Sequence, residues 1–299
     1  MSISEPVADP GLLAQVTVLV VTYNSRHCIA ALAGDLQALP HLIVVDNASQ
    51  DGTSEAVRAQ LPRAMLLQLS ANRGFGVANN EGLAQVRTPF ALLLNPDCLI
   101  APDAIADLVR AARQWPDATL LVPQLLDGSG RRQLNYSWPR NCWRPRTGAA
   151  DGVLNVGFAC AAAMLINLER LRAVLADGPG FDPRFFLYYE DEDLCLRVFQ
   201  RHGQILVLPG ITAVHHARGS VRGARPWRAE YWRGFHHAQS KVRFVAKHFG
   251  AAAGRRTRRR LLGTATANLL ARTLLLSPKH LARAWGRLCG VWQLGPKAV

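Results

Sequence analysis

Acidic residues are almost absent from the last part of this chain. Residues 217–299 contain 18 Lys and Arg but one acid, Glu230, whereas residues 1–216 contain 17 Lys and Arg and 20 acids. The two parts therefore carry net charges of +17 and −3, which together make the +14 of the whole chain. A weakly acidic body with a basic tail predicts a catalytic or binding domain joined to a segment that contacts anions, either lipid headgroups or nucleic acid.

Paired cysteines and long apolar runs are also missing. The six cysteines form no C-x-x-C pair, so the sequence predicts reduced thiols, with neither a zinc site nor disulfides. The first residues lack the basic start and apolar core of a signal peptide, and no uncharged apolar run reaches the ~20 residues of a membrane-spanning helix. We therefore expect a cytoplasmic body that follows a loose leader over residues 1–14.

A glycine-rich phosphate-binding turn is missing after the first predicted strand. Residues 16–21 form a β-branched run, but T-Y-N-S follows it in place of G-x-G-x-x-G. Gly74 and Gly76 come only after the third predicted strand. This pattern disfavours a dinucleotide-binding fold, and a nucleotide bound here would need side chains such as Asp46 to hold its base.

Strands and helical patterns alternate along the body of the chain. This alternation predicts βαβ units and an α/β fold with a mainly parallel central sheet flanked by helices. The predicted strands cover residues 16–21, 42–45, 65–69, 90–94, 120–122, 158–166 and 205–208.

Two of these strands end in residues that could bind a cation or a nucleotide. The run at 90–94 stops at Asn95, Pro96 and Asp97, and ligands gather at the carboxyl ends of strands in open α/β sheets. Asp97 can therefore bind a hard cation, although Asn-Pro-Asp is also common turn chemistry. Asp46 ends an earlier strand, where a nucleotide-binding role and an Asx turn with a helix cap at Thr53 or Ser54 are compatible.

Four consecutive acids at 190–193 follow the aromatic run at 185–189. Acids favour helix N-termini through the macrodipole, which accounts for some of them. A carboxylate beside aromatic walls is also an environment that produces a general base, so we favour a catalytic role for Glu190 and Asp191. Further on, either His215 or His216 could complete a cation site begun by Asp97, although a surface His pair often has no role.

The basic tail contains two helical patterns. One apolar stripe runs over residues 231–249, and another over residues 281–292 includes Trp285 and Trp292. Basic amphipathic helices with Trp on the apolar face suit an anionic membrane surface. We expect the first helix to dock partly on the protein itself and the last to lie on the membrane. The basic cluster at 255–260 leaves nucleic acid as a third option, but no matching motif accompanies it, so no nucleic acid is expected.

Six ordered blocks resemble the family 2 glycosyltransferases of the GT-A fold, particularly their rhamnosyltransferase-like branch. The blocks are V-T-Y-N-S at 21–25, V-V-D-N-A-S-x-D-G-T at 44–53, N-R-G-F-G-x-A-N-N at 72–80, L-L-N-P-D at 93–97, G-F-D-x-R-F-F-L-Y-Y-E-D-x-D-L-C-L-R at 180–197 and H-H-x-x-G-S at 215–220. The resemblance implies a GT-A catalytic domain over residues 15–225, with its nucleotide-binding half at about 15–125 and its acceptor-binding half at about 126–225. A basic amphipathic tail over 226–299 would follow it.

The resemblance also implies roles for individual residues. Asp97 and His215, with His216 as the alternative, would hold Mg²⁺ or Mn²⁺, while Asp191 would be the general base and Glu190 would contact the acceptor sugar. Asn95 stands in place of the first carboxylate of the family's D-x-D, so metal affinity would rest on fewer charges. The residues expected to hold the nucleotide sugar are Thr22, Tyr23, Asn24, Asp46, Asn47, Asn72, Gly74, Phe75, Gly76, Asn79 and Asn95.

The implied reaction is a single inverting displacement that moves L-rhamnose from dTDP-rhamnose onto a lipid-linked or cell-envelope glycan. The enzyme would work at the inner face of the cell membrane, bound peripherally through its tail. The Q-x-x-R-W mark of processive synthases is absent, so we expect transfer of one or a few residues. The alternatives are another hexose from a UDP- or GDP-sugar, and a non-catalytic protein that binds sugar nucleotides or membranes.

Overall fold

The computed structural model describes residues 9–138, 151–176, 180–216, 226–273 and 278–295. Its contacts divide the chain into two compact units. The first unit comprises Met1–Phe181 and Leu194–Val221, and the second comprises Asp182–Asp193 and Arg222–Val299.

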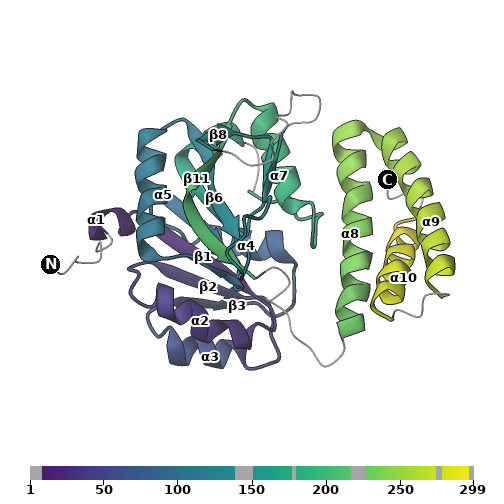
Figure 1. Ribbon diagram of the computed structural model, residues 1–299, viewed down its shortest axis with the longest axis horizontal. Helices are drawn as coiled ribbons and strands as arrows, with labels where there is room; N and C mark the ends of the chain where they lie inside the picture. The colour runs from purple at the N-terminus through teal and green to yellow at the C-terminus, as the bar shows by residue number, and fades with distance from the viewer. Residues whose placement is uncertain (1–8, 139–150, 177–179, 217–225, 274–277, 296–299) are drawn as a thin grey trace. The chain divides into compact units, whose positions relative to one another are not determined.

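Helices and strands alternate along the first unit, and helices dominate the second (Figure 1). The strands are β1 (Val16–Thr22), β2 (Leu42–Asp46), β3 (Met65–Gln68), β4 (Phe90–Leu94), β5 (Cys98–Leu99), β6 (Ala118–Leu126), β7 (Tyr136–Ser137), β8 (Leu154–Asn155), β9 (Phe158–Ala159), β10 (Ala163–Asn167) and β11 (Gln204–His215). The helices are α1 (Pro10–Leu13), α2 (Arg26–Leu36), α3 (Thr53–Gln60), α4 (Phe75–Leu83), α5 (Pro102–Gln114), α6 (Leu168–Val174), α7 (Glu190–Gln200), α8 (Pro226–Phe249), α9 (Ala251–Thr273) and α10 (Pro278–Gln293).

The central sheet of the first unit has the strand order β3-β2-β1-β4-β10-β6-β11-β5, and β8 pairs with β11. Neighbouring strands from β3 to β4 are parallel, as are β6 and β11, while β10 runs antiparallel between β4 and β6. This arrangement confirms the predicted α/β architecture. It also brings the carboxyl ends of β1, β2 and β4 to one edge, where parallel sheets commonly bind ligands.

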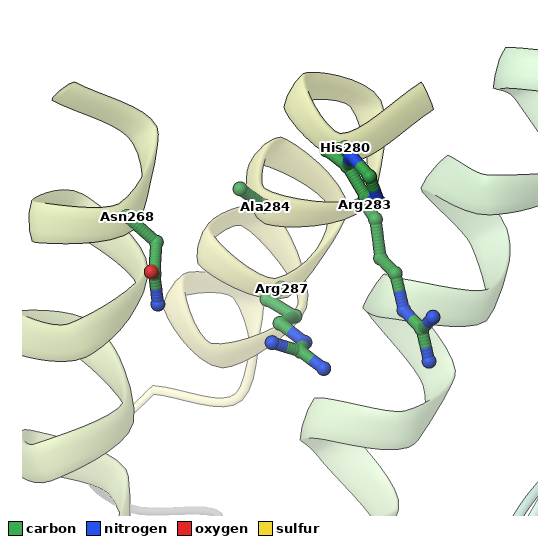
Figure 2. Close-up of a pocket in the computed structure, with 5 residues that line it drawn as sticks. All are labelled: Asn268, His280, Arg283, Ala284 and Arg287. Carbon is green, nitrogen blue, oxygen red and sulfur yellow. The ribbon is translucent and has the colours of Figure 1, made fainter. Parts of the chain in front are cut away.

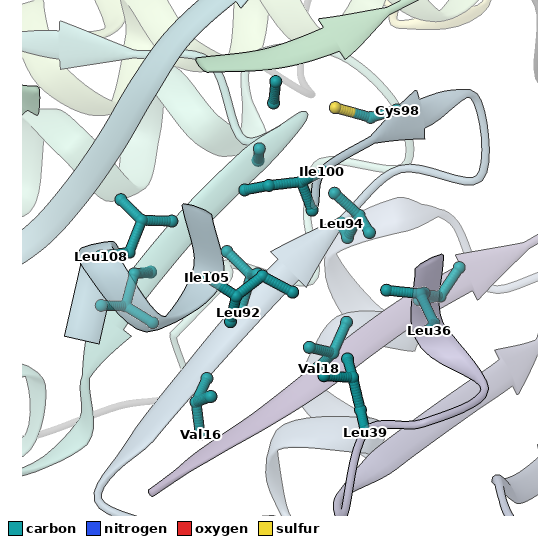
Figure 3. Close-up of a cluster of buried hydrophobic side chains, with 14 of the residues drawn as sticks. Val16, Val18, Leu36, Leu39, Leu92, Leu94, Cys98, Ile100, Ile105 and Leu108 are labelled. Atoms are coloured by element: carbon teal, nitrogen blue, oxygen red, sulfur yellow. The ribbon is translucent and has the colours of Figure 1, made fainter. Parts of the chain in front are cut away.

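Alternate residues of the buried strands face two separate apolar cores. In β1, Val18 belongs to one core and Leu19 to the other. Helices α2, α3 and α5 contribute to the first core, and Figure 3 shows Ile105 of α5 beside Leu92 of β4. Helices α4, α6 and α7 contribute to the second. Because both faces are covered, these strands read as continuous apolar runs in the sequence.

The hydropathy of residues 158–166 predicts one continuous strand, but the structure has two separate strands there. Strand β9 pairs with β7 in a small separate sheet, and β10 begins only at Ala163. Between them, Cys160 N donates to Asn135 O at 2.8 Å, and Ala162 O accepts from Asn95 N at 2.9 Å. These bonds lead the chain out of one sheet and into the other, and apolar content alone does not reveal them.

In the second unit, α10 crosses α8 at glycines. A Cβ at Gly286 would lie 2.0 Å from Tyr231 O, and one at Gly234 would lie 2.2 Å from Arg283 O. The two predicted helical patterns correspond to α8 and α10, whereas α9 was not predicted because its apolar residues form no continuous stripe. None of the described helices is long and apolar enough to cross a membrane.

Candidate functional site

The loops that follow β1 and β2 are joined by side-chain hydrogen bonds. Asp46, buried at the end of β2, accepts hydrogen bonds from the hydroxyl groups of Ser49 and Ser54, and from Thr22 Oγ1 at 3.4 Å. Asn24 N donates to Ser49 Oγ at 2.8 Å. Asn24 has a φ of 51°, a left-handed conformation that asparagine tolerates better than most residues.

Asp46 Oδ1 accepts from Ser49 N at 3.2 Å, three residues further on rather than the two of an Asx turn, and α3 lacks the expected side-chain helix cap. The residue that caps α3 is Gly52, with a φ of 83°, because the hydroxyl groups of Thr53 and Ser54 bind Asp51 and Asp46 instead. A nucleotide base that binds to Asp46 must therefore share a carboxylate that already accepts several hydrogen bonds.

Asn47 connects the loop after β2 to the loop after β3. Its Nδ2 donates to Asn72 Oδ1 at 2.9 Å and to Gly74 O at 3.2 Å, and its Oδ1 accepts from Arg73 N at 2.8 Å. Gly74 has a φ of 86° and precedes the first residue of α4. The expected nucleotide residues at these three strand ends are thus held in one connected network.

Helix α4 contains two adjacent asparagines with different contacts. Asn79, the expected nucleotide residue, is buried and donates to Phe75 O of its own helix at 2.9 Å. Asn80 accepts from Phe181 N at 2.9 Å and donates to Phe181 O at 2.7 Å. Asn80 is not among the predicted site residues, although the Asn-Asn doublet marks its position.

The remaining expected nucleotide residues lie in loops or first helical turns. Tyr23 is exposed after β1, Phe75 and the buried Gly76 begin α4, and the half-buried Asn95 follows β4.

Asp97 and His215 are brought together by strand pairing. Strand β5 pairs antiparallel with β11, so that Cys98 lies opposite His215. His215 Nε2 consequently lies 3.6 Å from Asp97 Oδ1, and both side chains are largely buried. His216 is exposed, and its ring lies about 3.0 Å from the position that a Cβ on Gly128 would occupy.

This pair is chemically suited to a divalent cation. Two ligand atoms that each lie about 2.1 Å from one ion are about 3 Å apart at a right angle, close to the observed separation. The Nδ1 atom of His215 is buried and has no hydrogen-bond partner among the described residues. The described residues hold no group of three His, Cys, Asp or Glu side chains that could bind a metal, so Asp97 and His215 are a candidate pair of ligands rather than a complete set.

The second unit carries Glu190 and Asp191 directly after a strained backbone. Tyr188 and Tyr189 both have a φ of 68°, which is rare for bulky residues and persists only where surrounding contacts enforce it. Helix α8 supplies such contacts. The His237 ring lies 5.6 Å and 5.4 Å from the rings of Tyr188 and Tyr189. Ser240 Oγ donates to Leu187 O at 2.9 Å.

The two carboxyl groups have different surroundings. Glu190 is buried, and its Oε2 has no hydrogen-bond partner among the described residues. Burial first, and the neighbouring Asp191 carboxylate second, raise the pKa of Glu190 well above its usual range. Asp191 is half-buried, and its Oδ1 accepts from Glu192 N at 2.9 Å. Glu190 is therefore suited to a protonated, hydrogen-bond-donating role, and Asp191 is suited to accept a proton.

The segment is fixed at its other end by Asp193. This fully buried carboxylate accepts from Lys247 Nζ at 2.5 Å and lies 2.7 Å from His248 Nε2. Lys247 also donates to Asp182 at 2.7 Å, and Asp182 binds Arg184. Burial opposes ionisation of Asp182, but the hydrogen bonds from Arg184 and Lys247 outweigh it, so the pKa of this carboxyl lies below its usual range. The apolar stripe predicted over residues 231–249 does not indicate this contact of Lys247.

Comparison with protein families identifies the first unit. The family model described as "Glycosyl transferase family 2" matches residues 17–171, just over half of the chain. The matched region begins in β1 and includes the loops that follow β1, β2, β3 and β4.

Individual relatives agree with this match. An "N-acetylglucosaminyl-diphospho-decaprenol L-rhamnosyltransferase" of Mycobacterium tuberculosis (strain ATCC 25618 / H37Rv) is 27% identical over 239 residues, which cover 68% of this chain and 76% of the relative. The mannosyltransferase PcManGT from Pyrobaculum calidifontis, solved in complex with GDP-Man and Mn²⁺, has a TM-score of 0.54 at 18% identity, over 97% of this chain and 92% of that one.

A third similar structure is residues 1–349 of S. aureus TarS in complex with UDP-GlcNAc, with a TM-score of 0.53 at 16% identity, over 94% of this chain and 92% of that one. In a longer TarS structure the match spans only 43% of that chain. These likenesses confirm the predicted GT-A fold.

Proposed function

The chain belongs to glycosyl transferase family 2 and is a glycosyltransferase, and from this premise we propose that it moves a single L-rhamnose from dTDP-rhamnose onto a lipid-linked or cell-envelope glycan. The observation that carries the choice of sugar is the relative named as an L-rhamnosyltransferase, which aligns with 68% of the chain. The name of that relative also supplies the class of acceptor, a sugar linked to a polyprenyl diphosphate.

The first unit would hold the donor. We assign the nucleotide to the network of Thr22, Asn24, Asp46, Asn47 and Asn72, in which the loops after three parallel strands are cross-linked. The other expected residues around it are Tyr23, Gly74, Phe75, Gly76, Asn79 and Asn95.

Asp97 and His215 would hold Mg²⁺ or Mn²⁺, whose positive charge stabilises a departing nucleoside diphosphate. The Mn²⁺ in the PcManGT structure supports a divalent cation in this fold. With Asn95 in place of a first carboxylate, only one protein carboxylate would bind the ion, so we expect weak metal affinity in the absence of the donor.

The second unit would supply the base. Asp191 takes the proton of the acceptor hydroxyl, and the oxygen of that hydroxyl forms a bond to the anomeric carbon. The bond between this carbon and the diphosphate oxygen breaks in the same step, which inverts the configuration. Glu190, whose raised pKa favours its protonated form, would donate a hydrogen bond to the acceptor sugar.

We also propose bounds for the catalytic domain and a membrane-binding role for the tail. We assign residues 15–225 to the catalytic domain and residues 226–299 to a tail that binds an anionic membrane surface at its cytoplasmic face. Trp285 and Trp292 of α10 support the tail assignment, because 50% and 76% of their surfaces are exposed.

Two alternatives make different predictions. A transferase for another hexose would use the same residues with a UDP- or GDP-sugar, because small changes in the sugar pocket redirect specificity. A non-catalytic binder would have no use for a buried, partnerless Glu190 oxygen beside Asp191.

A thermal-shift titration distinguishes these readings. The full chain is titrated with dTDP-rhamnose, UDP-glucose and GDP-mannose, each with and without Mn²⁺, because a ligand that binds only the folded state raises stability by RT ln(1 + [L]/Kd). We expect the largest shift with dTDP-rhamnose and Mn²⁺ together. A larger shift with a UDP- or GDP-sugar would reassign the donor, and no shift with any of them would contradict the transferase site.

A further inference from the structure

The apolar stripe of α8 is covered by α10, but one tryptophan of α8 lies outside it. Tyr231 and Phe235 belong to the stripe, and a Cβ at Gly286 would lie 2.0 Å from Tyr231 O, while one at Gly290 would lie 2.4 Å from Phe235 O. Trp232 does not belong to this stripe, and 44% of its surface is exposed. The packing of α8 on α10 therefore does not account for this tryptophan.

The ring of Trp232 is connected to the segment that carries the proposed base. His236, one helical turn further along α8, stacks on Trp232 with 5.6 Å between the ring centroids and 21° between the ring planes. The His236 ring also stacks on the ring of Phe186, at 4.4 Å and 26°. Phe186 lies four residues before Glu190. This ring row of Phe186, His236 and Trp232 thus leads from that segment to an exposed ring.

The outer ring of the row is held in place, and the middle ring is neutral. Tyr231 and Phe235 lie edge-on to the Trp232 ring, at 5.1 Å and 5.3 Å between centroids. Burial first, and the charge of Arg243 second, lower the pKa of His236 to about 4, so its ring is uncharged at pH 7. The row is therefore a preorganised aromatic surface, which keeps the entropic cost of binding a ligand low.

The residue after Trp232 presents a fixed guanidinium group. Arg233 Nη1 donates to Glu230 Oε1 at 2.7 Å, and Arg283 Nη1 lies 3.7 Å from Glu230 Oε2. Figure 2 shows the Arg283 side chain extending from α10 toward α8. Glu230 thus holds Arg233 in place without an anionic ligand. A guanidinium group has five N–H donors, and 20% of the Arg233 side chain is exposed, so donors remain for the hydroxyl groups of a neutral ligand.

An exposed aromatic ring followed by a fixed guanidinium group suits a pyranose. One face of a pyranose carries C–H bonds, whose partial positive charge is attracted to the negative face of an aromatic ring, and its rim carries hydroxyl groups that accept hydrogen bonds. A lipid surface fits less well, because a tryptophan that faces a membrane belongs to the apolar stripe of its helix, as Trp285 and Trp292 do in α10.

We propose that a pyranose ring of the acceptor stacks on the exposed part of the Trp232 ring, and that Arg233 donates hydrogen bonds to the hydroxyl groups of this pyranose. The identity of the ligand as the acceptor rests on the proposed function, whereas the recognition of a pyranose does not. The ring row would connect this platform to Glu190, the residue assigned to the acceptor sugar.

Binding of simple sugars to the full chain tests the platform without donor or turnover. The methyl glycosides of N-acetylglucosamine, glucose, galactose and mannose are titrated separately, and saturation-transfer NMR measures the Kd and the ligand protons that contact the protein. We expect at least one of them to bind, with the strongest saturation on the C–H protons of one ring face. No binding by any of the four would overturn the proposal.

Matched tryptophan variants locate the bound sugar. Trp232→Ala should weaken binding about tenfold or more, because it removes the stacking surface, and Trp232→Phe should recover part of the affinity. Trp227→Ala removes the other tryptophan of α8, which is 47% exposed, and should change binding little. Equal losses in the two alanine variants would overturn the platform. If Trp232→Ala does not fold, Trp232→Leu, which keeps an apolar side chain without a ring, decides.

A second pair of variants tests the guanidinium group. Arg233→Gln should weaken glycoside binding about threefold or more, because hydrogen bonds to the hydroxyl groups are lost. Arg228→Gln removes the same charge from an exposed position of α8 and should leave binding unchanged. Equal losses in both variants would contradict the role of Arg233.

Vesicle binding distinguishes a sugar from a lipid at Trp232. The natural chain and Trp232→Ala are compared on phosphatidylcholine vesicles that contain phosphatidylglycerol, and we expect equal binding. Weaker vesicle binding by Trp232→Ala, with unchanged glycoside binding, would assign this tryptophan to the membrane and overturn the proposal.

The outcome is independent of the donor site. Failure of the glycoside test, combined with a normal thermal shift by dTDP-rhamnose and Mn²⁺, would remove the platform and leave the transferase intact. Glycoside binding that depends on Trp232, without any donor shift, would support the platform and contradict the proposed function.

Discussion

At the scale of single residues, Asp97 and His215 lie far apart in the chain, and their closeness requires the pairing of β5 with β11. Asp97 was predicted from the end of an apolar strand. Short strands such as β5 have no clear hydropathy signal. Asn80 was missed for a similar reason, because its partner Phe181 lies 101 positions away.

The proposed cation site gives a prediction with an internal control. Asp97→Asn and His215→Gln should each abolish most of the Mn²⁺-dependent part of the thermal shift with dTDP-rhamnose, because each removes one of two protein ligands. His216→Gln changes the adjacent, exposed histidine and should leave that shift unchanged. If His216→Gln abolished the Mn²⁺-dependent shift and His215→Gln did not, His216 would replace His215 as the proposed metal ligand.

At the scale of elements, α8 differs most from its sequence-based interpretation. Its apolar stripe predicted docking or membrane contact, but its polar residues Ser240, Lys247 and His248 bind the segment that carries Glu190 and Asp191. The binary pattern of a helix shows which face is apolar and does not show what a polar face contacts. The strained Tyr188 and Tyr189 are likewise invisible in sequence.

We expect Lys247→Met to lower kcat by about tenfold or more while the dTDP-rhamnose thermal shift persists. The substitution leaves the buried Asp193 carboxylate without its ammonium partner, which loosens the position of Asp191 two residues before it. Lys247→Arg should recover part of kcat. Lys279→Met, at an exposed position of α10, is the matched control, and an equal fall in kcat there would remove the positioning role.

Stability of the second unit should depend on pH through two histidines of α8. Burial, followed by the charge of Arg243 for His236 and of Arg287, Lys241 and Arg283 for His237, lowers both pKa values to about 4. An unfolded chain binds these protons below about pH 6.5, whereas the folded chain does so only near pH 4. The contribution of these two histidines to the free energy of unfolding should therefore be fully present above about pH 6.5, and it should be lost as the pH falls to about 4.

Denaturant unfolding at pH 7 and pH 4.5, followed by tryptophan fluorescence, measures this effect. The double variant His236→Gln with His237→Gln should lose less free energy of unfolding between the two pH values than the natural chain. Glu190 titrates with the opposite sign, but it is present in both proteins and cancels in the difference. His41→Gln, at an exposed position of the first unit, should behave as the natural chain does.

At the scale of the whole molecule, the contrast between a weakly acidic body and a basic tail predicts that the tail binds anionic membranes. Truncation after Phe249 is a poor test, because it removes α10 from its close crossing with α8 at Gly234 and Gly286. Trp285→Ser with Trp292→Ser keeps the charge and the helix crossing. This variant should bind anionic vesicles about tenfold more weakly, and binding of the natural chain should fall as salt rises. Unchanged binding would contradict the membrane role of α10.

The fold was predictable because local patterns and packing agree along the body of the chain. Strands such as 16–21 and 90–94 are mostly apolar, and polar loops follow them, so an α/β sheet with polar loops at one edge follows from the sequence. The order of the strands was not predictable, because β10 inserts antiparallel between β4 and β6 through contacts distant in sequence.

The central claim, that this glycosyltransferase moves L-rhamnose with Asp191 as the base, is tested most directly by turnover of dTDP-rhamnose with a polyprenyl-diphosphate-linked acceptor. The natural chain and Asp191→Asn are compared, and donor binding is measured in both. The account predicts transfer with inversion by the natural chain, and a loss of kcat of at least about 100-fold in the variant with the donor shift retained. Transfer at a similar rate by Asp191→Asn would contradict it.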